Sequence, residues 1–151
     1  GLWLDAIKVK HSIQILSLVK PDDEVVAIDE LQFFDNNITK VIAKLMDEGK
    51  KVIGTGLELD FKAEPFGSMP QLLCLATTVD KLHAVCMKCG CEHATRTQRL
   101  IDGKPADKNS PLIMIGGDET YEARCIKCYE LPDKQHDVQK LNMKILPFSH
   151  R

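Results

Sequence analysis

Two matching pairs of cysteines constrain this chain more than any other feature of its sequence. Each pair has the spacing Cys-x-x-Cys, and the four residues are Cys86, Cys89, Cys125 and Cys128. A two-residue spacer lets one turn present both sulfurs to one ion, and two such turns complete a tetrahedral structural zinc site. Two disulfides are the alternative, but a bond across Cys-x-x-Cys is mainly a redox feature and does not explain why the pairs match. We therefore expect zinc at these four cysteines.

The two remaining cysteines are assigned other roles. Cys74 is expected to be a small buried residue and Cys91 a loop thiol, although Cys91 lies next to the first pair and could compete as a ligand. His83 precedes the first pair between apolar neighbours, and we expect it to be packed rather than to bind the metal.

The composition excludes several classes of protein. The 151 residues suffice for one domain with a buried core and a small appendage. A formal net charge of −2 and a pI of about 6.2 give no basic field for nucleic acid. No apolar run reaches membrane-spanning length, and no signal peptide is evident. Because the cysteines are spaced for metal, we expect a cytoplasmic protein without a nucleic-acid or membrane partner.

The apolar pattern predicts an α/β fold. The run over 25–28 suits a parallel strand covered on both faces. A helix over 35–48 stops at Gly49, and 51–56 forms a second apolar strand, which together make a right-handed βαβ unit. The flanking predictions are a strand-like start over 1–7, a short helix capped by Ser12, a helix that begins at Pro70 and a strand over 81–85.

Two carboxylates follow the first predicted strand. Asp29 and Glu30 lie at the carboxyl end of a strand, where open α/β sheets place ligands. This is the Walker-B position, in which one acidic residue holds magnesium and a neighbouring carboxylate orients or deprotonates an attacking hydroxyl. A solvated strand end explains the same pair without any chemistry.

Two further segments could enclose a ligand at this edge. Phe61 and Phe66 lie beyond the second strand, where a ring-shaped ligand would stack, although aromatic residues in a core need no ligand. Between the cysteine pairs, 95–101 predicts a strand, Asp102-Gly103 a turn and 112–115 a return strand. Zinc at the base of this polar loop would limit its freedom, so we expect a lid held in shape by the metal.

Four stretches carry a more specific signal, because they occur together in a fixed order. They are Ile28-Asp29-Glu30-Leu31-Gln32-Phe33-Phe34, then 60–67, 96–106 and 115–125. At this spacing they resemble the zinc-containing type II thymidine kinases, and the bacterial branch fits best. The resemblance implies a P-loop-NTPase-like (RecA-like) parallel sheet with helices and a small zinc-binding lasso subdomain. It implies a kinase core over 1–82, the lasso over 83–130, and a tail over 131–151 that is frayed or disordered.

The resemblance also implies an activity, which is ATP-dependent transfer of the γ-phosphate to the 5′-hydroxyl of thymidine in deoxynucleoside salvage. Asp29 would lie on the side of Mg-ATP, and Glu30 would be the catalytic base. The residues implied to bind thymidine are Phe33, Leu57, Phe61 and Phe66 in the core and Thr97, Arg99, Met114 and Tyr121 in the lasso. Thymidine triphosphate is the implied feedback inhibitor, and a homotetramer the implied assembly.

The sequence departs from the family at the phosphate loop. The motif G-x-x-x-x-G-K-S/T does not occur in these 151 residues. We expect the first βα unit to precede Gly1, so that this is a partial chain with an acceptor site and no donor site, which does not phosphorylate thymidine by itself. A smaller departure is Glu58, where the family carries Asp.

Two other functions stay open. A zinc-ribbon module that binds protein or nucleic acid would leave the βαβ unit over 24–56 without a purpose. An inactive relative would retain nucleoside binding alone. Stabilisation by thymidine or thymidine triphosphate would separate a nucleoside-binding protein from a ribbon module.

Overall fold

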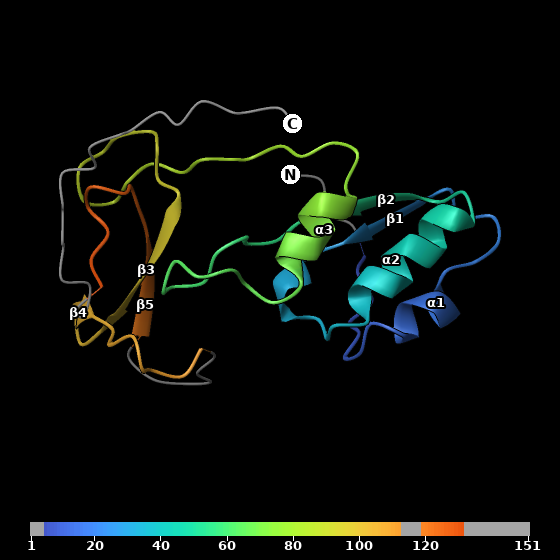
Figure 1. The fold of residues 1–151 in the computed structure, drawn as a ribbon, viewed down its shortest axis with the longest axis horizontal. Coiled ribbons are helices and arrows are strands. Elements are labelled where there is room, and N and C mark those ends of the chain that lie inside the picture. The colour runs from blue at the N-terminus through green and yellow to red at the C-terminus, as the bar shows by residue number, and fades with distance from the viewer. Residues whose placement is uncertain (1–4, 113–118, 132–151) are drawn as a thin grey trace, which may run out of the picture.

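The computed structural model of this protein describes residues 5–112 and 119–131, which contain two separate β-sheets (Figure 1). The first part of the chain forms α1 (Gln14–Leu18), β1 (Val25–Ile28), the 3₁₀ helix η1 (Leu31–Phe33), α2 (Ile38–Asp47), β2 (Lys51–Gly54) and α3 (Met69–Leu75). The second part forms β3 (Arg96–Ile101), β4 (Lys104–Pro105) and β5 (Glu119–Arg124). Within the described ranges, no helix has the length and apolar character needed to cross a membrane.

The strands β1 and β2 form a parallel pair that α2 connects, as the sequence predicted. In this pair Val26 lies opposite Val52. The buried side chains of α2 repeat at the spacing i, i+3, i+4 and i+7, which places them on one face of the helix, and they are Ile38, Val41, Ile42 and Leu45. The helix ends next to Gly49, whose φ of +79° favours glycine. The α/β class and the parallel sheet are confirmed.

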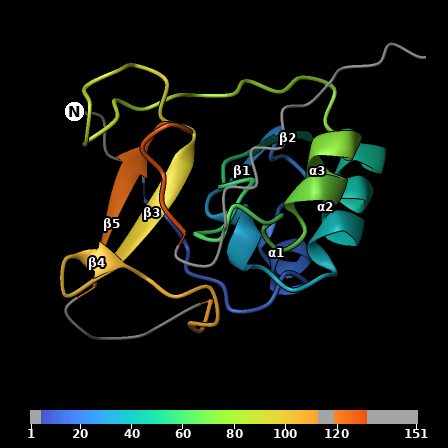
Figure 2. The ribbon, with the colours of Figure 1, turned by 60° about the vertical axis from the view of Figure 1, so that its left-hand side comes forward.

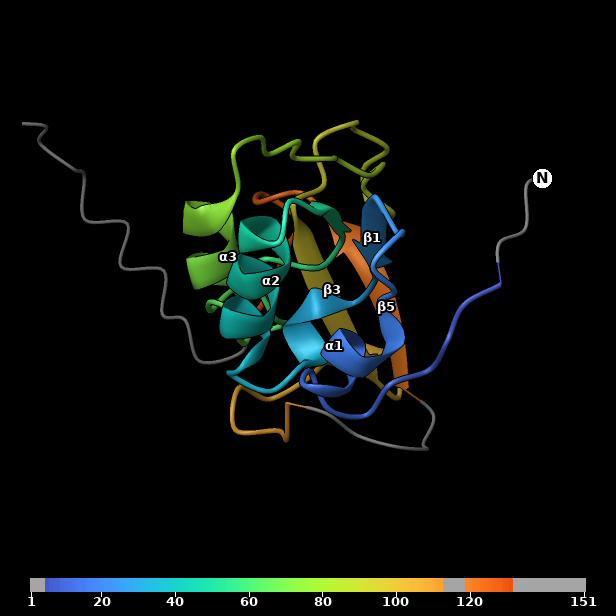
Figure 3. The ribbon, with the colours of Figure 1, turned by 90° about the vertical axis from the view of Figure 1, so that its right-hand side faces the viewer.

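The described helices cover only one face of this sheet. Val26, Ile28 and Val52 join a core that includes residues of α1, α2 and α3, and α2 and α3 lie side by side (Figure 3). Side chains alternate between the faces of a strand. Val25 and Ile53 therefore point away from this core, and they remain 51% and 48% exposed. The expectation of a first strand covered on both faces is wrong for the described residues, because the helices gather on the same side.

The segment between the cysteine pairs forms an antiparallel sheet in the order β4-β3-β5. Asp102 and Gly103, both with positive φ, make the predicted turn between β3 and β4. In the longer pair, Thr97 lies opposite Ala123 and Arg99 lies opposite Tyr121. The sequence pattern did not predict β5, and the return strand expected at 112–115 falls mostly outside the described residues.

Two connections link the sheets. Residues 76–83 run from α3 towards the first cysteine pair without regular structure, and the loop between β2 and α3 extends towards β3 before it returns (Figures 1 and 2). The strand predicted over 81–85 is reduced to one bridge between Ala84 and Ala94. A strand forms where a second strand pairs with it over several residues. Among the described residues, this segment pairs only through that bridge.

The beginning of the chain also differs from the prediction. Residues 5–9 form no strand, and 1–4 lie outside the described residues. Ser12 does not cap α1 with its side chain. Its hydroxyl instead donates to Asp35 Oδ1 (2.7 Å), and its N–H donates to Oδ2 (2.9 Å), so Ser12 ties the start of the chain to the segment before α2.

Candidate functional site

Each cysteine pair lies in a tight turn of the same form. In the first turn the backbone N–H of Gly90 donates to the carbonyl oxygen of Cys86 (2.8 Å). In the second turn the N–H of Tyr129 donates to the carbonyl oxygen of Cys125 (2.9 Å). Both bonds join a residue to the one four positions earlier, so each turn folds back on its first cysteine. Gly90 has a φ of +74°, which suits a residue without a Cβ atom.

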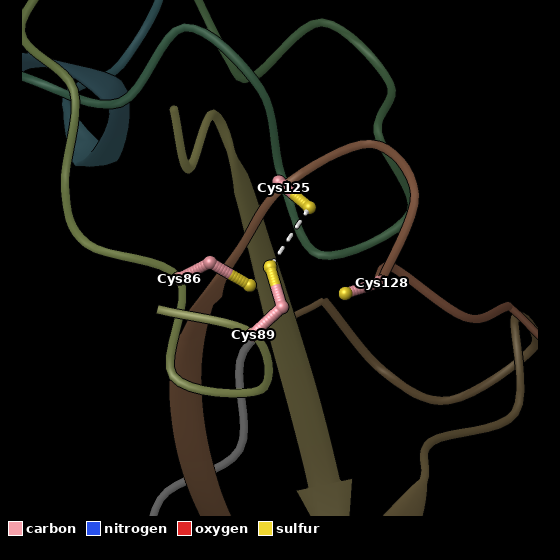
Figure 4. Close-up of side chains that lie close together, drawn as sticks. All are labelled: Cys86, Cys89, Cys125 and Cys128. Carbon is pink, nitrogen blue, oxygen red and sulfur yellow. Dashed lines mark hydrogen bonds between the residues drawn. The ribbon is translucent and has the colours of Figure 1, made fainter. Parts of the chain in front are cut away.

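The two turns bring four sulfur atoms together (Figure 4). The ligand atoms of Cys86, Cys89, Cys125 and Cys128 all lie within 4.8 Å of one another, and the sulfurs of Cys89 and Cys125 are 3.8 Å apart. A tetrahedron with zinc–sulfur bonds of about 2.3 Å has edges of about 3.8 Å, so the donor set and its spacing fit structural zinc. All six cysteines are free thiols, which argues against the alternative of two disulfides.

The electrostatics of the cluster also favour a bound cation. Burial raises the pKa of the Cys86 thiol, but hydrogen bonds from backbone N–H groups, first among them that of Cys125, outweigh burial and lower the pKa to about 6. The neighbouring Cys89 thiol, together with burial, raises the pKa of Cys128 to about 12. Cys86 is therefore the more readily ionised of these two thiols, and the thiolate is the form of cysteine that binds metal.

The three other candidate residues around this site lie outside the four-sulfur group. Cys91 is partly buried and packs against Cys86 and Cys125, but its sulfur is not among the four mutually close ligand atoms. His83 is exposed, contrary to the prediction, because it lies on the irregular connection 76–83. Its ring meets that of His93 edge-on, with centroids 6.0 Å apart. Cys74, predicted to be buried, is exposed on α3, whose buried side chains are Met69 and Leu72.

The two carboxylates after β1 are exposed and lie beside the end of β2. Asp29 Oδ1 accepts hydrogen bonds from the N–H of Glu30 (2.8 Å) and from the hydroxyl of Thr55. Backbone hydrogen bonds also connect the ends of β1 and β2. The N–H of Thr55 donates to the carbonyl oxygen of Ile28 (3.0 Å), and the N–H of Leu31 donates to the carbonyl oxygen of Thr55 (3.0 Å). The carboxyl ends of both parallel strands therefore meet at one edge, where ligands of open α/β sheets bind.

Glu30 has an unusual backbone conformation. Its φ of +55° and ψ of +44° lie in the left-handed region, which residues other than glycine rarely adopt. Such conformations cost about 1–3 kcal/mol and collect at functional sites, where the surrounding structure enforces them. The geometry therefore holds the Glu30 side chain in a direction that an ordinary strand end would not give.

The aromatic residues form two groups rather than one wall. Phe33 and Phe66 meet edge to face, with centroids 5.4 Å apart. Phe61 instead packs under the guanidinium of Arg99, at 5.0 Å from its ring centroid, and Tyr121 lies 5.9 Å from the same group. Arg99 is completely buried, and its Nη1 donates to the carbonyl oxygen of Pro111 (2.6 Å). The structure thus brings Phe61, Arg99 and Tyr121 together from both parts of the chain.

A cavity of about 540 Å³ lies between the loop after β2 and the antiparallel sheet. Three of the predicted thymidine-binding residues line it, namely Leu57, Thr97 and Tyr121. The other described site residues, Asp29, Glu30, Phe33, Phe61, Phe66 and Arg99, do not line it. Met114 lies outside the described residues.

Gln32 is a residue of this region to which sequence reasoning gave no role. It is 3% exposed, its Nε2 donates to the Glu30 carboxylate, and its Oε1 accepts the N–H of Leu57 (3.1 Å). Two signals in the sequence could have found it: Gln32 is a polar residue between Leu31 and Phe33, two positions after Glu30, and it belongs to the first stretch that carries the family resemblance.

Comparison with known protein families shows that the thymidine kinase family model matches residues 2–129. The match includes the carboxylates after β1, the loop after β2 and both cysteine pairs. The four-cysteine cluster is compatible with the zinc-binding lasso of type II thymidine kinases. From this match over most of its length, the chain belongs to the thymidine kinase family.

Proposed function

We propose that this chain forms the thymidine-binding side of an ATP-dependent thymidine kinase of type II, with a P-loop-NTPase-like core. The observation that carries the proposal is the position of Asp29 and Glu30 at the carboxyl end of a parallel strand, tied to the end of the next strand through Thr55. Family membership supplies the substrate class, and this edge of the sheet is where such folds bind ligands.

Glu30 is the proposed base, and it accepts the proton of the thymidine 5′-hydroxyl. The freed oxygen bonds to the γ-phosphorus of ATP, and the bond between the γ-phosphorus and the bridging oxygen breaks, which leaves ADP. Because the transition state of phosphoryl transfer is loose, holding the hydroxyl in line contributes as much as proton removal. Asp29 faces the side of Mg-ATP, and magnesium, when bound there, neutralises charge on the phosphates.

The nucleoside is proposed to bind between the loop after β2 and the lasso. Leu57, Thr97 and Tyr121 already share one cavity, which supports their role. Arg99 holds Phe61 and Tyr121 in place from its buried position. The remaining proposed contacts are Phe33 and Phe66, from the edge-to-face pair, and Met114.

Zinc is proposed to act on the lasso without touching substrate. The first cysteine pair precedes β3, and the second pair follows β5 directly. A metal among the four cysteines would therefore fix both ends of the segment. We propose the kinase core over 1–82, the lasso over 83–130 and a tail over 131–151. Thymidine triphosphate as feedback inhibitor and a homotetramer remain proposals drawn from the family.

Two measurements test this function. Nucleoside binding is measured on these 151 residues, and turnover, here and below, is measured on a protein that joins them to the phosphate-loop unit, whose motif does not occur in this sequence. Isothermal titration should detect thymidine binding and much weaker binding of guanosine, whereas a zinc-ribbon module would bind neither. Glu30→Gln should lower kcat by about 100-fold or more with thymidine and ATP, while thymidine binding persists. Binding without transfer in the protein that includes the phosphate-loop unit would identify an inactive nucleoside-binding relative, and wild-type kcat in Glu30→Gln would refute the role of Glu30.

A further inference from the structure

A buried glutamine side chain lies directly beside the proposed base. Gln32 is 3% exposed and lies in η1, two residues after Glu30. Its amide makes two hydrogen bonds, one to the carboxylate of the proposed base Glu30 and one to the backbone N–H of Leu57. Leu57 in turn lines the cavity between the loop after β2 and the antiparallel sheet. One side chain therefore joins the carboxylate to the wall of the pocket.

The chemistry of these partners fixes the orientation of the amide. The N–H of Leu57 can only donate, so the amide oxygen of Gln32 must face it, at 3.1 Å. The amide nitrogen then faces Glu30, whose ionised carboxylate can only accept. Glutamine is the residue that offers an acceptor and a donor on one planar group of this length. A carboxylate or an apolar side chain at this position would lose one bond or both.

The surrounding backbone leaves space for this side chain. A Cβ atom on Gly56 would lie 2.7 Å from Gln32 Oε1, and a Cβ atom on Gly67 would lie 2.4 Å from the Gln32 carbonyl oxygen. At Gly67 the crowded atom is backbone, so glycine is required there, whereas at Gly56 a Cβ atom would push the Gln32 amide away from its partners. The bond to Glu30 also acts on a residue whose backbone is left-handed at φ +55°. Gln32 is thus held on several sides while it holds the carboxylate.

We propose that Gln32 is a positioning residue that couples the direction of the Glu30 carboxylate to the pocket wall at Leu57. The inference rests on the proposed function, since it assumes that Glu30 is the base. With one carboxylate oxygen held by the amide, the other faces the acceptor hydroxyl. A nucleoside that shifts Leu57 shifts the same amide, so binding and base alignment depend on one side chain.

Two substitutions distinguish the two hydrogen bonds of the Gln32 amide, the one to Glu30 and the one to Leu57 (the two arms of this coupling). Gln32→Glu keeps an acceptor for Leu57 but removes the donor to Glu30 and places a second negative charge beside it. We expect kcat to fall about tenfold or more, with the thymidine dissociation constant within about threefold of wild type. Gln32→Met removes both arms, so kcat should fall and thymidine binding should weaken as well.

A matched control measures the general cost of losing a buried glutamine. Gln98 is 2% exposed and exchanges two hydrogen bonds with the backbone of Glu130, at 2.9 and 2.8 Å, and its amide also donates a longer bond to the Arg99 carbonyl oxygen (3.3 Å). Gln98→Met therefore removes at least as many bonds as Gln32→Met, away from Glu30. For equal losses of melting temperature, the loss of kcat should be much larger at Gln32. Wild-type kcat in Gln32→Glu, or a loss no larger than that of Gln98→Met, would overturn the inference.

The result for Glu30→Gln keeps this inference apart from the proposed function. If Glu30→Gln is inactive and Gln32→Glu behaves as wild type, only the positioning role fails. If Glu30→Gln is fully active, the assignment of the base fails, and the positioning role falls with it.

Discussion

The hydroxyl of Tyr129 donates a 2.6 Å hydrogen bond to the backbone carbonyl oxygen of Phe61. Tyr129 directly follows Cys128, and its N–H closes the second cysteine turn. Phe61 lies in the loop after β2, under the Arg99 guanidinium. Burial raises the pKa of the Tyr129 phenol, and the Asp60 carboxylate adds to the rise, so the O–H remains a donor at neutral pH. The Tyr129 side chain therefore joins the four-cysteine cluster to the loop of the proposed nucleoside site.

Replacing Tyr129 with Phe tests this link. The substitution removes the O–H and keeps the ring, so we expect the free energy of unfolding to fall by about 1 kcal/mol. Zinc content should not change, because the N–H that closes the turn belongs to the backbone. Urea denaturation and metal analysis of the purified variant measure both quantities. Loss of zinc would show that the hydroxyl supports the metal turn rather than the loop.

Removing zinc should loosen the antiparallel sheet and spare the parallel one. Cys86→Ser deletes a buried ligand, so amide hydrogen exchange should accelerate in β3 and β5 and stay slow in α2, which has its own core. Thymidine affinity should fall with it. Cys91→Ser is the matched control, because its sulfur is outside the four-sulfur group, and it should retain zinc and the wild-type exchange pattern. Zinc loss in both variants would place Cys91 among the ligands.

Two glycines with positive φ allow the cost of backbone strain to be separated from the cost of steric crowding. Gly49 (φ +79°) has nothing within 4 Å of an added Cβ atom, whereas at Gly67 (φ +52°) that atom would meet the Gln32 carbonyl oxygen at 2.4 Å. We expect Gly49→Ala to cost about 1 kcal/mol from its conformation alone. Gly67→Ala should cost about 1–3 kcal/mol more. Equal costs in chemical denaturation would mean that the chain relaxes around Gln32.

The acid sensitivity of the fold should depend in part on Asp35. Hydrogen bonds from the backbone N–H and then the hydroxyl of Ser12 lower the pKa of its carboxyl to about 2. Since the value in the unfolded chain is about 4, the ionised carboxylate stabilises the fold above pH 4. This contribution is lost as the pH falls from about 4 towards 2.

The variant Ser12→Ala removes the hydroxyl donor and keeps the N–H. The unfolding free energy of this variant should therefore change less steeply between pH 4 and pH 2 than that of the unchanged protein. Asp35→Asn should show a still weaker dependence, because it has no carboxyl to titrate. An identical pH dependence in all three proteins would show that Ser12 does not set the acid response.

Local patterns predicted the parts of the structure that depend on neighbours in sequence. The helical repeat from Ile38 to Leu45 and the Cys-x-x-Cys spacing each act within a few residues, and the structure contains both α2 and the four-sulfur cluster. The place of Asp29 and Glu30 after a strand followed from the same kind of signal. The assignment of substrates to named residues came from the family resemblance and remains a proposal.

Features set by distant partners could not be predicted in this way. The pairing of Arg99 opposite Tyr121 joins residues on either side of a long connection, and no periodicity in either strand specifies that register. Gln32 looks like an exposed polar residue until Leu57 and Gly67 enclose it. The exposure of Val25 depends on which face of the sheet the helices cover, and an apolar run in the sequence does not predict that face.

The two cysteine turns are equivalent in a way that bears on how the lasso closes. Each contributes one buried sulfur, from Cys86 or Cys125, and one less buried sulfur, and each closes with the same backbone bond. Because both turns present a buried and a less buried sulfur, a metal bound among them would hold the two ends of the segment together in the same way. A metal bound there would make the ends of the lasso rigid, while the pairing of β3 with β5 sets which residues of the lasso lie opposite each other.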